Sequence, residues 1–133
     1  MKKLVFLLFL ITFPMSAQQF PSLQWKNRII CITSETFDDD NATRQIKMLD
    51  NDERGKKDRK LVVLHCTSEI CRNAFTKASI SATPSEQVAK FKVRLIGLDG
   101  GVKFTSKTPV PLQKFYELID QMPMRQAELR TKN

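Results

Sequence analysis

Three cysteines and one histidine are the residues of this chain best suited to chemistry. Cys66 and Cys71 lie in the segment LHCTSEIC, directly after an apolar run, and His65 precedes Cys66. In an oxidising compartment such a pair can be a reactive dithiol, a structural disulfide or two unrelated buried thiols. The elements that hold the pair decide among these three.

A disulfide requires the two Cα atoms to lie within roughly 7 Å of each other. Five helical residues rise about 7.5 Å, so a helix from Thr67 to Cys71 would keep the cysteines too far apart. A turn would bring them together, and Thr67-Ser68 after a strand end is typical of a turn. We therefore predict a Cys66–Cys71 disulfide, structural first and redox-active second.

The other candidate residues favour packing over chemistry. Cys31 lies within an apolar run and is interpreted as a small buried hydrophobe. Successive strand residues point to opposite faces, so His65 is poorly placed as a base for Cys66 and is expected to be partly buried with one nitrogen satisfied. Zinc is an alternative, but Cys-x₄-Cys spacing matches no common zinc motif. No metal and no other cofactor is predicted.

The N-terminus predicts export. Lys2 and Lys3 precede an apolar run over residues 4–13, which ends at Pro14 shortly before Ala17. A basic start, a short apolar core and a small residue at the cut are typical of a signal peptide over residues 1–17. The run is about half the roughly 20 residues that a bilayer span needs, so no transmembrane segment is expected. Residues 18–133 should form one soluble periplasmic or extracellular domain.

The formal net charge of the chain is +8. Its bases are scattered, with one denser patch from Arg54 to Lys60 that has no aromatic residue to stack on bases, so nucleic-acid binding is not predicted. We interpret the patch as a solvated loop, and attraction to anionic envelope polymers or lipid headgroups as the alternative.

The first half of the domain reads as a β-α-β unit. Ile29–Thr33 and Leu61–His65 are near-continuous apolar runs, typical of strands buried on both faces. Between them, acidic residues at 38–40 precede a helical pattern, which predicts a capped helix from about Asp39 to Arg54. A calcium site at this acidic run is an alternative, but the run lacks the spaced ligands of known loops. Two strands joined by a helix should be parallel neighbours.

The second half predicts short helices around Cys71–Lys77 and Ser85–Lys90, then a hairpin. The hairpin strand Phe91–Leu98 should flank Ile29–Thr33 on its other side. Asp99-Gly100 between apolar alternations predicts a tight turn with positive φ at both residues. An amphipathic helix from Leu112 follows and is stopped by Pro123. This order predicts an α/β fold with the thioredoxin-like arrangement: a mixed sheet of at least four strands, with helices on both faces.

LIGLDGGVKF and LIDQMPMRQAELR closely resemble the signature of the family catalogued as domain of unknown function 4174. The resemblance spans roughly residues 25–129. It implies an extracytoplasmic domain that is similar to the peroxiredoxin-like modules of sushi-repeat extracellular proteins, and it implies no established activity. We interpret the matching residues as structural, with a partner-binding surface at the C-terminal tail as the alternative: Trp25, Arg28, Asp99, Gly100, Gly101, Asp120, Met122, Pro123, Met124, Arg125 and Glu128. Arg125 and Glu128, three apart, should pair.

In thioredoxin-type enzymes the attacking thiol follows the first core strand, at a helix N-terminus that lowers its pKa. Here that position reads Ser34 to Asp40, without a cysteine and with carboxylates that would raise a thiol pKa. Two hypotheses remain, and the first is preferred. One is a non-catalytic module that binds an envelope or secreted partner, and the other is a thiol-disulfide or peroxide-handling protein using Cys66 and Cys71.

Overall fold

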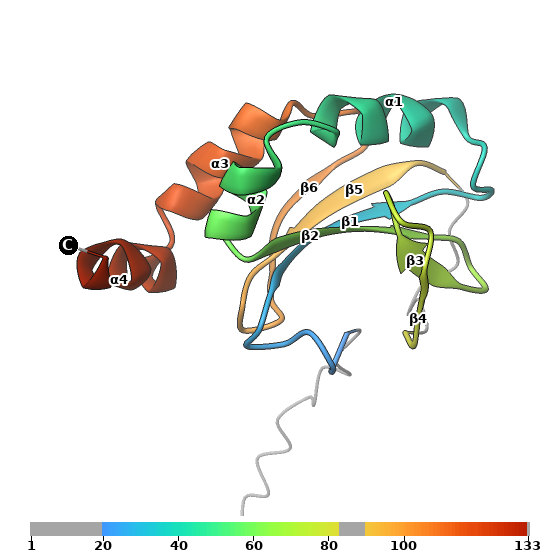
Figure 1. Ribbon diagram of the computed structural model, residues 1–133. Helices are drawn as coiled ribbons and strands as arrows, with labels where there is room; N and C mark the ends of the chain where they lie inside the picture. The colour runs from blue at the N-terminus through green and yellow to red at the C-terminus, as the bar shows by residue number, and fades with distance from the viewer. Residues whose placement is uncertain (1–19, 83–89, 133) are drawn as a thin grey trace, which may run out of the picture.

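The computed structural model describes residues 20–82 and 90–132, and within them six strands form one mixed sheet in the order β4-β3-β2-β1-β5-β6 (Figure 1). The expected signal peptide lies outside the described residues. In chain order the elements are β1 (Arg28–Thr33), α1 (Asp40–Leu49), α2 (Glu53–Asp58), β2 (Leu61–Cys66), β3 (Cys71–Asn73), β4 (Ser79–Ile80), β5 (Lys92–Ile96), β6 (Val102–Ser106), α3 (Leu112–Asp120) and α4 (Pro123–Thr131).

The centre of the sheet matches the prediction. β1 pairs in parallel with β2 on one side and antiparallel with β5 on the other. All residues of β1 are buried, as a near-continuous apolar run requires for a strand covered on both faces. The α/β class with a mixed sheet of at least four strands is confirmed.

The helices that cover the sheet lie on one side of it. In Figure 1, α1, α2 and α3 run along one face, and α4 lies beyond the end of α3. The core beneath them includes Ile30, Val63, Leu95 and Phe115. A smaller apolar cluster on the opposite face includes Phe20 and Cys31. The described residues place no helix on that face, in contrast to the expectation of helices on both. None of the described helices has the length and apolarity that a membrane span requires.

The predicted helix from Asp39 to Arg54 is two helices, α1 and α2. The predicted cap is present, because the Asp39 carboxylate accepts from the Ala42 backbone N–H at 2.9 Å. The chain breaks at Asp52, which has a left-handed φ of 51° and caps α2 by accepting from the Gly55 N–H at 3.1 Å. Asp is one of the few side chains that tolerates this conformation, and its carboxylate supplies the cap of the next helix.

The basic patch is not a solvated loop throughout. Lys56 lies in α2 and is 3% exposed. Its Nζ donates to the Leu49 carbonyl at 2.7 Å, pairs with Glu53 at 2.8 Å and lies 4.3 Å from the centre of the Phe75 ring. The loop interpretation is therefore wrong for the patch from Arg54 to Asp58, which is helical. The solvated interpretation is wrong for Lys56, which packs its stem inward and satisfies its ammonium locally.

The predicted helix around Cys71–Lys77 is wrong, because this segment holds β3 and a turn. The Asn73 side chain accepts from the Phe75 and Thr76 N–H groups, and Lys77 has a φ of 61°. An Asn that bonds the backbone two and three residues ahead favours a turn over a helix. The helix predicted at Ser85–Lys90 falls mostly on residues 83–89, outside the described residues.

The hairpin is confirmed, but its turn is longer than predicted. β5 and β6 pair antiparallel, and a loop over residues 97–101 joins them. Gly100 has a φ of 82°, whereas Asp99 does not have a positive φ. Asp99 instead accepts from the Gly101 N–H at 2.9 Å and pairs with Lys103 at 2.9 Å. Downstream, Pro123 ends the preceding helical stretch and also opens α4, at the position where a missing N–H costs nothing.

Candidate functional site at the cysteine-bearing edge of the sheet

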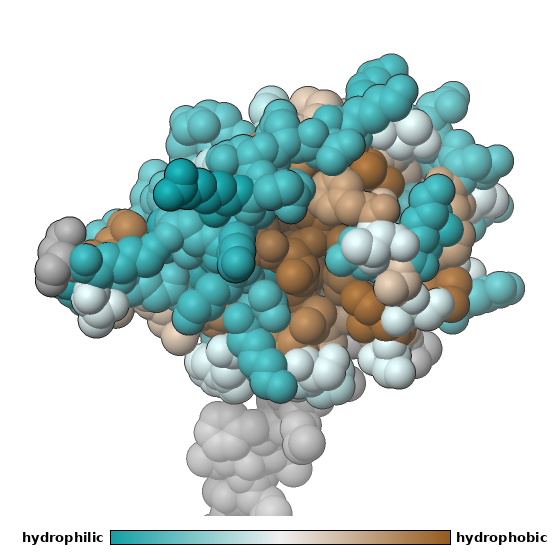
Figure 2. All heavy atoms as spheres, in the orientation of Figure 1, coloured by the Kyte–Doolittle hydropathy of each residue, from teal (hydrophilic) through white to brown (hydrophobic). Residues whose placement is uncertain are grey.

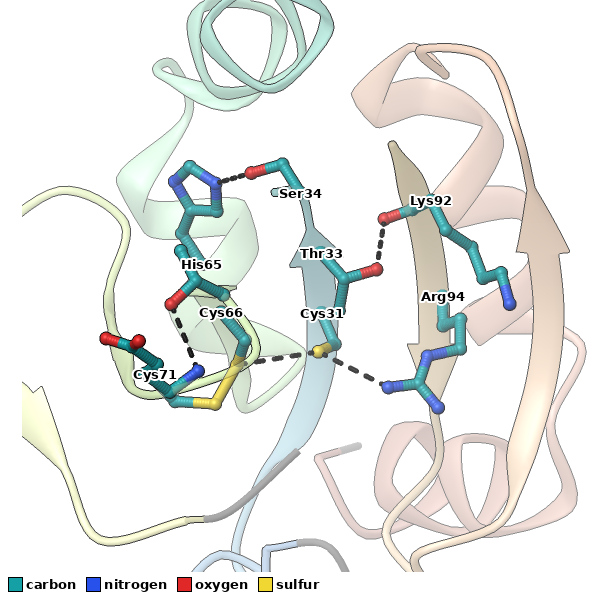
Figure 3. The surroundings of a disulfide bond; sticks show 10 residues. Cys31, Thr33, Ser34, His65, Cys66, Cys71, Lys92 and Arg94 are labelled. Carbon is teal, nitrogen blue, oxygen red and sulfur yellow. Dashed lines mark hydrogen bonds between the residues drawn. A yellow bond between two sulfur atoms is a disulfide. The ribbon is translucent and has the colours of Figure 1, made fainter. Parts of the chain in front are cut away.

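The predicted disulfide is present. Cys66 ends β2 and Cys71 opens β3, and the two residues oppose each other across the strand pair (Figure 3). A tight turn, with the Thr67 N–H bonded to the Ile70 carbonyl at 2.9 Å, brings the two Cα atoms to 4.0 Å. Both cysteines are 0% exposed. The bridge thus joins a central strand to a three-residue strand near the edge of the sheet.

Cys31 is buried, as predicted, and it lies against the bridge. Its Sγ is 4.0 Å from the Cys66 Sγ and 3.7 Å from Nη2 of Arg94 on β5. Burial raises the pKa of the Cys31 thiol, and the nearby Arg94 charge and hydrogen bond lower it only in part. The thiol is therefore protonated near neutral pH, although a cation and a disulfide lie beside it.

His65 faces away from the cysteines, toward the helices. This agrees with strand alternation, because His65 shares a face with Ile32 of the helix-covered core and Cys66 lies in the opposite cluster. Its Nε2 lies 2.6 Å from the Ser34 Oγ, while that hydroxyl donates to the Thr36 carbonyl at 2.7 Å. One ring nitrogen is therefore satisfied, as predicted, although the side chain is fully buried rather than partly buried.

The surroundings of His65 keep it neutral. Because the Ser34 hydroxyl donates elsewhere, Nε2 carries the hydrogen, and Nδ1 has no partner among the described residues. Phe37 packs edge-on at 5.0 Å, and the Arg72 guanidinium stacks on Phe37 at 3.7 Å. Burial, followed by the charge of Arg72 and against the opposing charge of Asp39, lowers the pKa of His65 to about 4.

The sequence did not predict the Ser34–His65 pair or the approach of Arg94 to Cys31. The first was accessible in principle, because parallel pairing of the two strands places Ser34 and His65 at the same carboxyl edge. The arrangement can hold the loop after β1 against β2, and it presents a cysteine pair closed off from solvent. Among residues 20–82 and 90–132, no three His, Cys, Asp or Glu side chains gather where they could hold a metal ion.

A family model described as a domain of unknown function (DUF4174) matches residues 19–128 of the chain. The chain belongs to the DUF4174 family. No curated protein matches it.

Most of the residues that carry the DUF4174 resemblance lie far from the cysteines. Asp99, Gly100 and Gly101 shape the hairpin loop, and Pro123 opens α4. Trp25 is 61% exposed and donates its backbone N–H to the Leu98 carbonyl at 2.7 Å. Met122 packs against the helix-covered core, and Met124 is exposed beside a hollow of about 270 Å³.

The remaining signature residues meet where β1 and β2 begin. Asp58 and Arg59, which are not signature residues, lie among them, and we name the whole set the ionic cluster: Arg28, Asp58, Arg59, Asp120, Arg125 and Glu128. Arg125 is 2% exposed and its guanidinium pairs with Asp58 at 2.7 Å, Asp120 at 3.2 Å and Glu128 at 3.4 Å. The predicted Arg125–Glu128 pair is therefore confirmed as part of a larger network.

Arg28 completes the ionic cluster from β1. It is fully buried, pairs with Glu128 at 3.1 Å and donates to the Arg59 carbonyl at 2.9 Å. Arg59 in turn pairs with Asp120 at 2.9 Å and stacks on the Tyr116 ring at 3.8 Å. Partial burial raises the pKa values of Asp120 and Glu128, but the guanidinium groups outweigh it and hold both pKa values below their ordinary range. The ionic cluster thus ties α3 and α4 to the start of the sheet.

Proposed function

We propose that the chain is an exported, thioredoxin-like module that acts by binding a partner rather than by catalysis. The burial of all three sulfurs carries this proposal: Cys31, Cys66 and Cys71 are each 0% exposed. A thiol acts on another molecule only as an accessible thiolate. The position after β1 supports the same conclusion, because it holds Ser34, which is buried and bonded to His65 and Thr36.

The test is a turnover assay of residues 18–133, with insulin reduction and peroxide consumption as readouts. We expect rates equal to those of buffer with reductant or peroxide alone. Turnover by the unmodified protein that Cys66→Ser abolishes would overturn the proposal. Thermal unfolding of Cys66→Ser, compared with that of the dithiothreitol-reduced parent, would separate lost chemistry from lost folding.

Export is the second part of the proposal, and residues 1–17 support it through their basic start, apolar core and Ala17. Expression of the full chain in a Gram-negative host should give a periplasmic product that begins at Gln18. A product retained in the cytoplasm with Met1 intact would contradict export.

A thiol-disulfide protein is the second candidate, and the position of Cys31 favours it. In the step this geometry allows, Cys31 loses its proton and attacks the Cys66 Sγ, 4.0 Å away. A Cys31–Cys66 bond forms, the Cys66–Cys71 bond breaks, and Cys71 takes up the proton, so no external oxidant is required. Native alkylation followed by peptide mapping tests this step. A labelled Cys71 together with a Cys31–Cys66 bridge supports the step. Detection of the Cys66–Cys71 bridge and no other excludes it.

A further inference from the structure

A groove of about 620 Å³ lies between α2 and the strands β2 and β3. We name it the basic groove, and its lining divides into two sets. Its floor is formed mainly by Leu61, Val62, Val63 and Phe75, and its rim by Asn27, Glu53, Arg54, Lys56, Lys57, Lys60 and Asn73. Figure 2 shows the face of the molecule that carries α2, β2 and β3. Brown side chains gather at the centre of this face, beside the teal side chains over α2.

The charge of the rim is positive and turned to solvent. Lys56 and Glu53 pair with each other, so they cancel. Arg54, Lys57 and Lys60 are exposed. Arg54 and Lys57 form no ion pair within the described part of the chain, and the carboxylate paired with Lys60 is that of Glu128, at 3.8 Å. Three cations around an apolar floor favour a ligand that combines carboxylates with apolar groups.

The floor also offers an unpaired strand edge. The carbonyl of Lys60 accepts from Arg28 of β1 and that of Cys66 from Ser34, the residue after β1, so the even-numbered residues of β2 turn their backbone groups toward β1. The odd-numbered residues turn toward β3, as the bond from the Ala74 N–H to the Val63 carbonyl shows. β3 pairs only with the second half of β2, because the Asn73 turn leads the chain away. No described strand therefore reaches the backbone N–H and C=O of Leu61.

We propose that the basic groove binds an extended acidic segment of a partner protein. The segment continues the line of β3 along the first half of β2, bonds to the Leu61 edge, and pairs its carboxylates with Arg54, Lys57 and Lys60. Successive side chains of the segment point to opposite faces, so its carboxylates face α2 and its apolar side chains lie on Val62. The N–H and C=O of Leu61 favour a peptide over an anionic lipid or polymer, because one extended residue of another backbone can bond to both. This proposal rests on the binding function proposed above.

The experiment measures fluorescence anisotropy of the oxidised protein with a labelled ten-residue peptide of alternating Glu and Val. Arg54→Glu/Lys57→Glu should weaken binding at least tenfold. Lys107→Glu/Lys114→Glu makes the same charge change on exposed residues outside the groove and should weaken binding less than twofold. Circular dichroism confirms that both variants fold. Equal losses of affinity in the two variants would show that net charge alone drives the binding, and would overturn the proposal.

Two further arms decide the ligand class. A peptide with N-methyl groups on alternate backbone amides should bind at least fivefold more weakly, and equal binding would exclude use of the strand edge. Phosphatidylglycerol vesicles should bind more weakly than the peptide, and tighter, groove-dependent binding would replace the peptide with a lipid surface. Turnover in the insulin or peroxide assay would contradict the proposed function, whereas no turnover and no peptide binding would contradict the groove alone.

Discussion

The two ends of the parallel pair β1–β2 bury polar groups in opposite ways. At the carboxyl end, Ser34, His65 and the three cysteines are hidden as neutral groups, and His65 is neutral because its pKa lies near 4. At the amino end, Arg28 and Arg125 are just as deeply buried, and carboxylates pair with their guanidinium groups. The buried groups at the carboxyl end are neutral, whereas the buried charges at the amino end are paired with opposite charges.

The difference shows what four of the residues that carry the DUF4174 resemblance do in this chain. In open α/β sheets, chemistry is expected at the carboxyl ends of the strands. Arg28, Asp120, Arg125 and Glu128 lie at the other end, where they fasten α3 and α4 to the sheet. These four residues therefore hold the C-terminal helices against the sheet.

The largest expected effect is at the amino end. Arg125→Ala removes a guanidinium that is 2% exposed and bonds three carboxylates and the Asp58 carbonyl. Arg28 and Arg59 still pair with Glu128 and Asp120, so the loss is that of several charge-assisted hydrogen bonds, and the free energy of unfolding should fall by about 3–4 kcal/mol. Arg130→Ala, on the exposed side of the same helix, should change it by less than about 0.5 kcal/mol. Urea unfolding measures both. Similar values for the two variants would mean that the ionic cluster does not stabilise the fold.

The carboxyl end should show its effect in pH dependence. Because the pKa of His65 falls from 6.5 to about 4 on folding, the unfolded chain binds an extra proton between these pH values. Acidification through this window should lower the free energy of unfolding by about 3 kcal/mol in total. His65 is the chain's only histidine, so His65→Gln should flatten the curve between pH 6.5 and 4. An unchanged slope would contradict the burial of a neutral ring.

The disulfide should contribute less to the free energy of unfolding than Arg125 or the neutral His65 does. Closing a loop with a sequence separation of 5 restricts the unfolded chain by about 2 kcal/mol at 25 °C. The Cys66→Ala/Cys71→Ala variant should lose roughly this amount in urea unfolding and become insensitive to reductant. Cys31→Ala, the matched change at the neighbouring sulfur, should remain sensitive to reductant. Insensitivity of Cys31→Ala would show that the bridge involves Cys31.

The smallest expected effect is the loss of stability that the ionic cluster undergoes at low pH. The pKa values of Asp120 and Glu128 are depressed, so their contribution is present above their ordinary values of 3.8 and 4.5 and is lost as pH falls further. Asp120→Asn should flatten the stability curve below about pH 4, by on the order of 1 kcal/mol since water screens the carboxylate. The His65→Gln variant should still lose this stability as the pH falls below about 4. A shared pH window for the two variants would contradict the separation of the two ends.

The fold was predictable wherever a periodic or continuous pattern was long enough to read. β1, β2 and the hairpin follow from apolar runs, and α3 follows from its amphipathic spacing. β3 was predicted as helix because three residues carry no periodicity, and the Asn73 turn that ends it acts through a single side chain. The break between α1 and α2 depends on a left-handed Asp52, which a helical pattern does not reveal.

The candidate site was predictable only in its covalent part. The spacing of Cys66 and Cys71, with turn-like residues between them, was sufficient for the disulfide. The contact of Cys31 with Cys66 depends on a side-by-side register of two strands that the sequence does not specify to the residue. The burial of Arg28 was equally hidden, because an arginine is normally exposed unless distant carboxylates meet it.

The disulfide lies next to the weakest part of the sheet, since β3 and β4 have only three and two residues and form its outer edge. A reductant cannot reach sulfurs that are 0% exposed until these strands detach. When they reclose faster than the reagent reacts, the observed rate is the opening equilibrium constant multiplied by the intrinsic rate of exchange. The rate at which dithiothreitol cleaves the disulfide therefore measures the local unfolding of this edge of the sheet, without isotopic labelling.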